Sequence, residues 1–252
     1  MADKLKAVVL AAGKGTRLHT DEIDAPKVMR EACGKPLLWY VLEAISFVDK
    51  SDIILVVGYK KENVIGEFSE YPYAIQSEQL GTGHAVMAAE EKLNNYDGAL
   101  LVCYGDMPAI KRDVYEELVR NHIEEGNACT ILTGESTLKM AFGRIERDAN
   151  GNFLQVVEEK DCTPEQLKIK ELNTGVYVFN TPLLVSSLKE LKNDNSQGEY
   201  YITDVPAIMR EKGAKIGLIN RNLGDDIIGV NTVEQLEMVE KILKNYKLQI
   251  TD

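Results

Sequence analysis

The chain alternates short, continuously apolar runs with longer segments in which apolar residues recur at helical spacing. The continuous runs lie at residues 6–12, 52–58, 98–106 and 128–134. The helical patterns lie at residues 36–48, 83–93 and 111–125, and Pro36 suits a first helical turn. Strands that are apolar throughout are typical of a sheet buried on both faces. The order strand, helix, strand therefore predicts an α/β fold with a doubly wound, mostly parallel sheet and right-handed crossovers.

The pattern changes after about residue 142. Residues 142–159 predict two strands joined by a turn at Asn150-Gly151, and residues 171–180 predict another strand. The amphipathic segment 232–248 predicts a final helix. We therefore predict a single domain over residues 1–252, in which a smaller, β-rich part begins near residue 141 and shares the sheet of the first part.

Composition narrows the class of protein without identifying it. Hydrophobic residues make up 44% of the 252 residues, which is enough for a packed core and excludes a disordered chain. No apolar run approaches the length that spans a bilayer, and the four cysteines form no CxxC pair that would indicate zinc. The net charge of −11 argues against general binding of nucleic acid. We expect a cytoplasmic protein with neither membrane nor nucleic acid as a partner.

The stretch LAAGKGTRL at residues 10–18 follows the first predicted strand directly. A glycine-rich turn at the carboxyl end of a strand exposes backbone N–H groups that can cradle phosphate oxygens. Lys14, Arg17 and Lys27 would add charge-assisted bonds, so a small anion could bind despite the negative net charge. The spacing fits neither the dinucleotide fingerprint, which needs a third glycine at Leu18, nor the Walker pattern. By itself, GKG indicates a tight turn with solvated lysines equally well.

Further motifs follow along the chain. They are QSEQLGTGHA at 76–85, YGDMPAI at 104–110, FGRI at 142–145, VVEEKD at 156–161, ELNTGVYVF at 171–179, NSQGEYYITD at 195–204 and GVNT at 229–232. With the opening loop and PKVM at residues 26–29, they resemble the uridyltransferase domain of bacterial N-acetylglucosamine-1-phosphate uridyltransferases, within the sugar-1-phosphate nucleotidyltransferase family. The resemblance covers nearly the whole chain. It implies a Rossmann-like nucleotidyltransferase fold in which residues 1–140 bind the nucleotide and residues 141–252 bind the sugar.

The bifunctional enzymes of that kind continue into a left-handed β-helix of hexapeptide repeats, which carries acetyltransferase activity and builds a trimer. No hexapeptide repeat is visible in this sequence. We therefore predict no left-handed β-helix, no acetyltransferase activity, and a monomer or dimer instead of that trimer.

The resemblance implies Mg²⁺-dependent transfer of a uridylyl group from UTP to N-acetylglucosamine 1-phosphate, giving UDP-N-acetylglucosamine and pyrophosphate. The attacking phosphate monoester is largely a dianion, because its second pKa is about 6, so it needs no strong base. Positioning and charge neutralisation should supply most of the catalysis. Two alternatives stay open: the same reaction with glucose 1-phosphate or N-acetylgalactosamine 1-phosphate, and a non-catalytic regulator that binds nucleotide sugars.

The resemblance also assigns catalytic and metal-binding residues. Arg17 and Lys27 would bind the triphosphate and stabilise the leaving pyrophosphate, and Asp106 is the third residue assigned to catalysis. Asp106, at the end of an apolar strand, and Asn231, in GVNT, would hold Mg²⁺ with phosphate oxygens and water. Either of these two could instead cap a helix: Asp106 the helix expected near Pro108, and Asn231 the last helix.

Two further sets of residues are assigned to the substrates by resemblance. The nucleotide set is Leu10, Ala11, Ala12, Gly13, Lys14, Gly15, Gln76, Gln79, Gly81, Thr82, Tyr104 and Gly105. The sugar set is Gly143, Glu158, Asn173, Tyr201 and Thr203, with Glu159, Lys160 and Tyr200 as neighbours that could take the same roles. The amide of Gln76 can match the uracil edge, although a polar loop with Thr82 as a helix cap is the alternative.

Two features are assigned no chemical role. His19, His84 and His122 form no acid–base set, so we interpret each as structural, with His84 the one nearest the nucleotide loop. The acidic segment at residues 18–25 would repel phosphate if it folded inward, so we expect it to point out to solvent.

Overall fold

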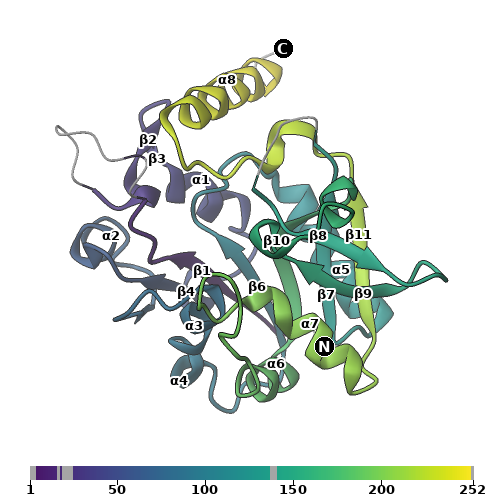
Figure 1. The fold of residues 1–252 in the computed structure, drawn as a ribbon. Helices are drawn as coiled ribbons and strands as arrows, with labels where there is room; N and C mark the ends of the chain where they lie inside the picture. The colour runs from purple at the N-terminus through teal and green to yellow at the C-terminus, as the bar shows by residue number, and fades with distance from the viewer. Residues whose placement is uncertain (1–3, 16–17, 19–24, 137–140, 251–252) are drawn as a thin grey trace.

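The centre of the protein is a twisted sheet with helices on both faces, seen in the computed structural model of Figure 1, which describes residues 4–15, 18, 25–136 and 141–250. Its strands are β1 (Leu5–Ala11), β4 (Ile53–Val57), β5 (Tyr73–Ile75), β6 (Ala99–Tyr104), β7 (Cys129–Gly134), β8 (Arg144–Arg147), β9 (Phe153–Val157), β10 (Leu172–Asn180) and β11 (Ile216–Arg221). The strand order is β11-β7-β10-β6-β1-β4-β5, and the hairpin β8–β9 attaches to β10.

The sheet is mostly parallel. Strand β1 runs parallel to β4 and β6, β5 to β4, and β11 to β7, whereas β10 is inserted antiparallel between β6 and β7. The four continuous apolar runs of the sequence are β1, β4, β6 and β7. The prediction of a mostly parallel, mixed α/β sheet is therefore confirmed.

Alternate residues of each central strand enter different halves of the core. Val8 and Leu10 of β1 belong to one buried cluster, and Ala7 and Val9 belong to the other. Because both faces of the strand are buried, there is no polar face, and the strand is apolar without interruption.

Helices cover both faces of this sheet. They are α1 (Leu37–Ala44), α2 (Lys61–Glu67), α3 (Thr82–Met87), α4 (Glu90–Leu93), α5 (Arg112–Glu125), α6 (Thr181–Leu188), α7 (Val205–Glu211) and α8 (Val233–Ile250). Helices α1, α5 and α8 pack into one cluster, and α3, α6 and α7 into the other, so the sheet is doubly wound. The single helix expected over residues 83–93 is two, α3 and α4. Pro36 has an extended backbone and precedes α1, pairing with Glu31 across the short hairpin of β2 (Glu31–Ala32) and β3 (Lys35–Pro36).

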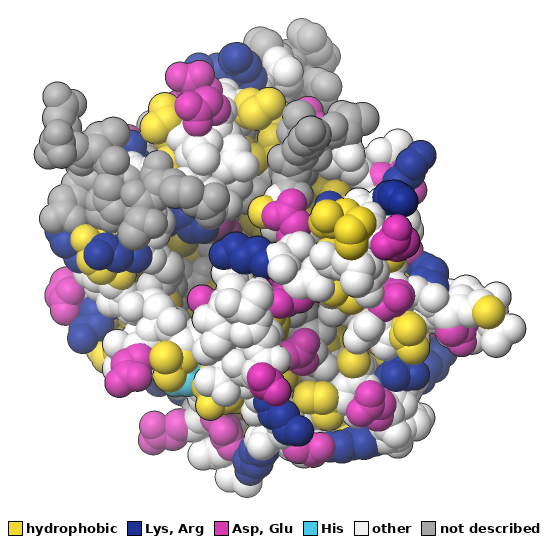
Figure 2. All heavy atoms as spheres, viewed as in Figure 1, with side chains coloured by type: hydrophobic (Ala, Val, Ile, Leu, Met, Phe, Trp, Pro, Cys, Tyr) yellow, Lys and Arg dark blue, Asp and Glu magenta, His cyan; other side chains and the backbone are white. Residues whose placement is uncertain are grey.

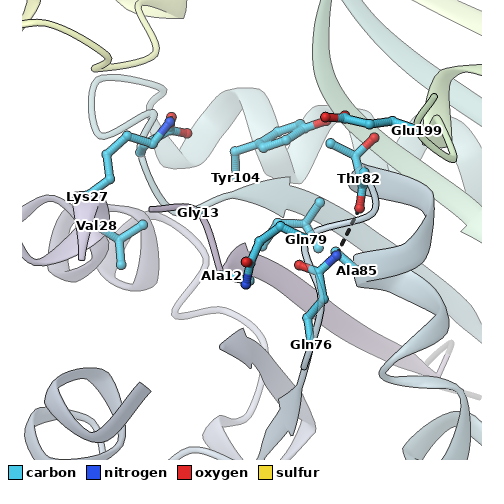
Figure 3. A pocket seen from close by; sticks show the side chains of 13 residues that line it. Ala12, Gly13, Lys27, Val28, Gln76, Gln79, Thr82, Ala85, Tyr104 and Glu199 are labelled. Atoms are coloured by element: carbon cyan, nitrogen blue, oxygen red, sulfur yellow. Dashed lines mark hydrogen bonds and ion pairs between the residues drawn. The ribbon is translucent and has the colours of Figure 1, made fainter. Parts of the chain in front are cut away.

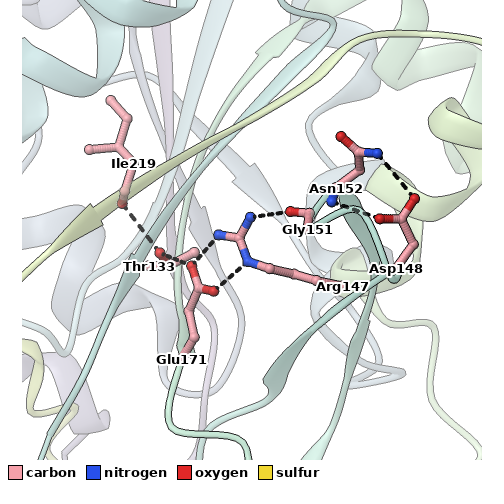
Figure 4. Close-up of polar contacts among 7 residues, drawn as sticks. All are labelled: Thr133, Arg147, Asp148, Gly151, Asn152, Glu171 and Ile219. Atoms are coloured by element: carbon pink, nitrogen blue, oxygen red, sulfur yellow. Dashed lines mark hydrogen bonds and ion pairs between the residues drawn. The ribbon is translucent and has the colours of Figure 1, made fainter.

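The predicted β-hairpin forms β8 and β9, and polar contacts fasten it to the sheet (Figure 4). The guanidinium of Arg147 donates two bonds of 2.8 Å to the carboxylate of Glu171, and it also donates to the carbonyl of Gly151 in the turn. Thr133 of β7 donates to the same carboxylate at 2.7 Å. Burial alone would raise the pKa of Glu171, but the bonds from Arg147 and Thr133 bring that pKa below its ordinary value. This contact joins the β-rich part to the central sheet.

No helix within the described ranges is both long enough and apolar enough to cross a bilayer. On the face drawn in Figure 2, acidic and basic side chains lie interspersed instead of forming one basic area.

Candidate functional site

A cavity of about 230 Å³ opens at the carboxyl ends of β1 and β6 (Figure 3). It is lined by Leu10, Ala12, Gly13, Lys27, Val28, Gln76, Gln79, Gly81, Thr82, Ala85, Tyr104, Asp106 and Glu199. The position follows the rule that open α/β sheets bind ligands beyond the carboxyl ends of their strands. Of the residues assigned to the nucleotide, Ala11, Lys14, Gly15 and Gly105 do not line this cavity. Ala11 is buried in the core, and the ammonium of Lys14 lies 5.3 Å from the centre of the Tyr59 ring.

A second cavity, also of about 230 Å³, lies beside the β-rich part. It is lined by Lys27, Tyr104, Asp106, Met107, Ala141, Phe142, Gly143, Glu158, Asn173, Thr174, Gly175, Gly229 and Asn231. Three of the residues assigned to the sugar, Gly143, Glu158 and Asn173, are in this wall. Lys27, Tyr104 and Asp106 line both cavities, so the two cavities meet at these three side chains.

Lys27 lies at this junction because the opening loop leaves room for it. Gly15 has a φ of +63°, and a Cβ there would lie only 2.7 Å from the Cβ of Lys27. A side chain at position 15 would therefore displace the short 3-10 turn Lys27–Met29 that carries the lysine. The absence of a side chain at Gly15 thus allows Lys27 to lie at the junction.

The ammonium of Lys27 bridges two oxygens from distant parts of the chain. It forms an ion pair with Asp106 Oδ2, and it donates a hydrogen bond of 3.0 Å to Asn231 Oδ1. The side chains of Lys27 and Asp106 are 16% and 10% exposed, so little water reaches the pair. Asp106 and Asn231 therefore aim one oxygen each at a single point that attracts a cation.

Hydrogen bonds with backbone groups hold Asp106 and Asn231 in place. The N–H of Val230 donates to the carbonyl of Asp106 at 2.9 Å, which ties the end of β6 to the segment before α8. The amide nitrogen of Asn231 donates to the carbonyl of Gly229 at 3.1 Å, so its oxygen faces Lys27. Each residue thus presents a side-chain oxygen to the Lys27 ammonium.

Neither Asp106 nor Asn231 serves as a helix cap. Helix α8 is capped by Thr232 and Gln235, which exchange reciprocal side-chain bonds to each other's backbone N–H groups. No helix begins near Pro108, because the next one, α5, begins at Arg112.

The donor set at this point fits a hard divalent cation. One carboxylate oxygen and one amide oxygen suit Mg²⁺, which usually keeps several waters and phosphate oxygens as further ligands. Within the part of the chain that the structure describes, no cluster of three or more His, Cys, Asp or Glu side chains could hold a metal.

Gln76 reaches the floor of the first cavity from the end of β5, and its side chain is buried. Its amide nitrogen donates to the carbonyl of Gly81 at 3.0 Å and lies 3.2 Å from Nδ1 of His84. His84 does not line the cavity, and it contacts the site through the side chain of Gln76. Thr82 is the first residue of α3 and not its cap, and its hydroxyl accepts a bond from the N–H of Ile202.

Two of the residues assigned to the sugar, Tyr201 and Thr203, do not line the second cavity. The hydroxyl of Thr203 donates to Glu158 Oε1 at 2.9 Å, and the hydroxyl of Tyr201 accepts from Gln197 at 2.8 Å. Burial raises the pKa of Glu158, the nearby charges of Asp204 and Asp161 add to this effect, and the bond from Thr203 opposes it. Thr203 therefore supports Glu158 without lining the cavity.

In the wall between the cavities, the ring of Tyr104 lies close against the backbone of Gly175. Strand β10 has an irregular register between Asn173 and Tyr177, and within it Gly175 has a φ of +82°. A Cβ at Gly175 would lie 2.4 Å from the ring of Tyr104. The amide of Asn173 is held at both ends, accepting from Gly175 N and donating to the hydroxyl of Tyr177.

Several lining residues were missed by sequence reasoning. Glu199 lines the first cavity, and Phe142 and Thr174 line the second. Each belongs to one of the motifs that carry the family resemblance, so membership in these motifs is the signal that the sequence offers. Arg17, His19 and residues 20–24 lie outside the described residues. His122 is buried, beside the hydroxyl of Thr130 at 3.1 Å.

Comparison with known proteins agrees with the resemblance found in the sequence motifs. The family described as nucleotidyl transferase matches residues 6–226. The bifunctional protein GlmU of Caldanaerobacter subterraneus subsp. tengcongensis is 44% identical over 245 residues, which are 96% of this chain and 52% of the relative. Proteins of the same name from Lactobacillus delbrueckii subsp. bulgaricus and Clostridium novyi are 44% and 43% identical, over 94% of this chain and 51% and 52% of their own lengths. The chain thus spans about half the length of these curated relatives, and it belongs to the nucleotidyl transferase family.

Proposed function

We propose that this chain transfers a uridylyl group from UTP to N-acetylglucosamine 1-phosphate, by in-line attack of the sugar phosphate on the α-phosphorus. The observation that carries the proposal is the junction of the two cavities at Lys27, Tyr104 and Asp106. Two bound molecules react fastest when their reacting groups are held side by side. The nucleotide in the first cavity and the sugar in the second would both present phosphates to this junction.

Two features of the second cavity support the proposal of an N-acetylated sugar as the substrate. The carboxylate of Glu158 accepts bonds from hydroxyls, and its bond from Thr203 keeps it in one orientation. Ala141 and Phe142 add apolar surface that suits the methyl of an acetyl group.

The junction offers charge neutralisation by Lys27, which lines both cavities. Among the described residues that line the two cavities there is no Ser, Cys or His. This composition suits an attacking phosphate dianion, which carries its own nucleophilic oxygen. Lys27 supplies positive charge at the junction, and we propose that Arg17 supplies more.

We also propose that Asp106 and Asn231 hold Mg²⁺, which would neutralise negative charge on the phosphate oxygens when bound. The support is that their two oxygens already share one cation, the Lys27 ammonium. These residues fit the group by donor type as well as by position.

Pyrophosphate release tests the proposal. UTP is offered with N-acetylglucosamine 1-phosphate, N-acetylgalactosamine 1-phosphate or glucose 1-phosphate, with MgCl₂ or with EDTA. We expect rapid release only with N-acetylglucosamine 1-phosphate and MgCl₂. Faster release with another sugar phosphate would overturn the sugar assignment. Absence of release with all three, from protein that still binds UTP, would favour the non-catalytic regulator.

A further inference from the structure

The orientation of the Gln76 side chain is determined by its partners. Its nitrogen lies 3.0 Å from the carbonyl oxygen of Gly81, and a carbonyl can only accept a hydrogen bond. The NH₂ end of the amide must therefore point toward Gly81. Figure 3 shows the amide oxygen on the opposite side, turned away from that bond.

His84 takes the second proton of the same NH₂ group. Nδ1 of His84 lies 3.2 Å from the Gln76 nitrogen, so Nδ1 is the acceptor and the neutral imidazole carries its proton on Nε2. With Gly81 and His84 each accepting one proton, the amide has no N–H left for a ligand. The group that Gln76 presents to the cavity is its oxygen.

An amide oxygen distinguishes the two pyrimidine bases. Uracil carries an N–H at position 3 and can donate to such an oxygen, whereas cytosine carries a lone pair there. A mismatch of this kind leaves two acceptors facing each other in a buried place, which is costly.

We propose that His84 is a positioning residue that sets this selectivity, by holding the Gln76 amide with its oxygen toward the base. The inference rests on the proposed use of the first cavity for UTP. Without His84, only the bond to Gly81 resists rotation of the amide, and the turned amide would offer N–H donors that suit cytosine.

Kinetics with UTP and CTP test the role of His84. We expect His84→Ala to reduce the ratio of kcat/KM for UTP over CTP by about 10-fold, the worth of one hydrogen bond. The loss should come from a higher KM for UTP, with kcat and the KM for the sugar phosphate close to wild type. His84→Asn places an amide oxygen where Nδ1 stood, and it should restore most of the ratio. A general structural role would lower both kcat/KM values equally and leave the ratio unchanged, which would overturn the inference.

Direct binding separates this inference from the proposed function. Titration calorimetry with UMP and CMP needs no turnover, and it should show the preference for UMP narrowing in His84→Ala and recovering in His84→Asn. That result without any pyrophosphate release would leave the His84 role standing and the proposed reaction refuted. Normal release with an unchanged UMP preference would refute only the His84 role. If His84→Ala fails to fold, His84→Leu fills the same space without an acceptor and serves in its place.

Discussion

Replacing Lys27 with methionine tests whether the junction is built around a cation. Methionine keeps most of the length of the side chain but removes the ammonium that contacts Asp106 and Asn231. Asp106 is only 7% exposed, so water cannot readily replace the lost partner. The variant therefore has a nearly buried carboxylate with no counter-charge from Lys27.

We expect Lys27→Met to reduce the free energy of unfolding by a large amount for a single substitution. Removing one partner of a buried ion pair costs about 3 kcal/mol of unfolding free energy, the lower end of the usual range because Lys27 keeps some exposure. For a chain of this size, that loss lowers the melting temperature by roughly 6–12 °C. Mg²⁺ bound to the vacated oxygens at a hundred times its Kd would restore about 2.7 kcal/mol. Wild type should respond less to Mg²⁺, because the metal must first displace the ammonium.

Calorimetric melting in EDTA and in graded MgCl₂, without nucleotide, measures both effects. Lys6→Met is the matched control, since it breaks another lysine–aspartate pair, Lys6 with Asp52, whose side chains are 22% and 39% exposed. We expect the control to lose less than about 1 kcal/mol and to respond to Mg²⁺ as wild type does. Equal Mg²⁺ responses in Lys27→Met and wild type would refute the shared cation point.

Three other changes have defined outcomes. Asp106→Asn should lower Mg²⁺-dependent pyrophosphate release by about 100-fold or more, measured over a range of MgCl₂; near-normal release would contradict the metal role. Thr203→Val should raise the KM for the sugar phosphate about 10-fold without changing the KM for UTP, because it frees Glu158; equal changes in both would point to general damage. Burial lowers the pKa of His122 from 6.5 to about 4, so its contribution to stability is complete above pH 6.5 and is lost as the pH falls toward 4. We expect about 2 kcal/mol, after allowance for solvent screening, to disappear over that interval; His122→Gln should remove this slope from denaturant titrations.

The central sheet was predictable from sequence because its physical signal is local. Val8 and Val9 point into opposite halves of the core, and this double burial produces the unbroken apolar run. The place of β10 was not predictable in the same way. Its apolar run indicates a buried strand, but nothing in the run specifies insertion between β6 and β7, or an antiparallel direction.

The residues that line the cavities were also predictable only in part. Ala12 and Gly13 were assigned to the nucleotide by resemblance, and both line the first cavity at the end of the parallel strand β1. Glu199 was missed because its neighbours in the same motif were equally polar, and only the fold shows which side chain faces the cavity. Thr203 was placed in the sugar pocket by resemblance, and it reaches that pocket only through Glu158.

At the junction the structure brings together residues to which the sequence motifs assign separate roles. Lys27 was assigned to the triphosphate and Asp106 with Asn231 to the metal, as separate roles, yet the structure brings all three into one contact. A metal ion and the Lys27 ammonium cannot occupy one point together, so metal binding at Asp106 and Asn231 requires the ammonium to leave. The displaced ammonium then needs another anion nearby, and a triphosphate in the first cavity would provide one. We therefore expect metal and UTP each to tighten the binding of the other, and this mutual effect should weaken in Lys27→Met, where no cation has to move.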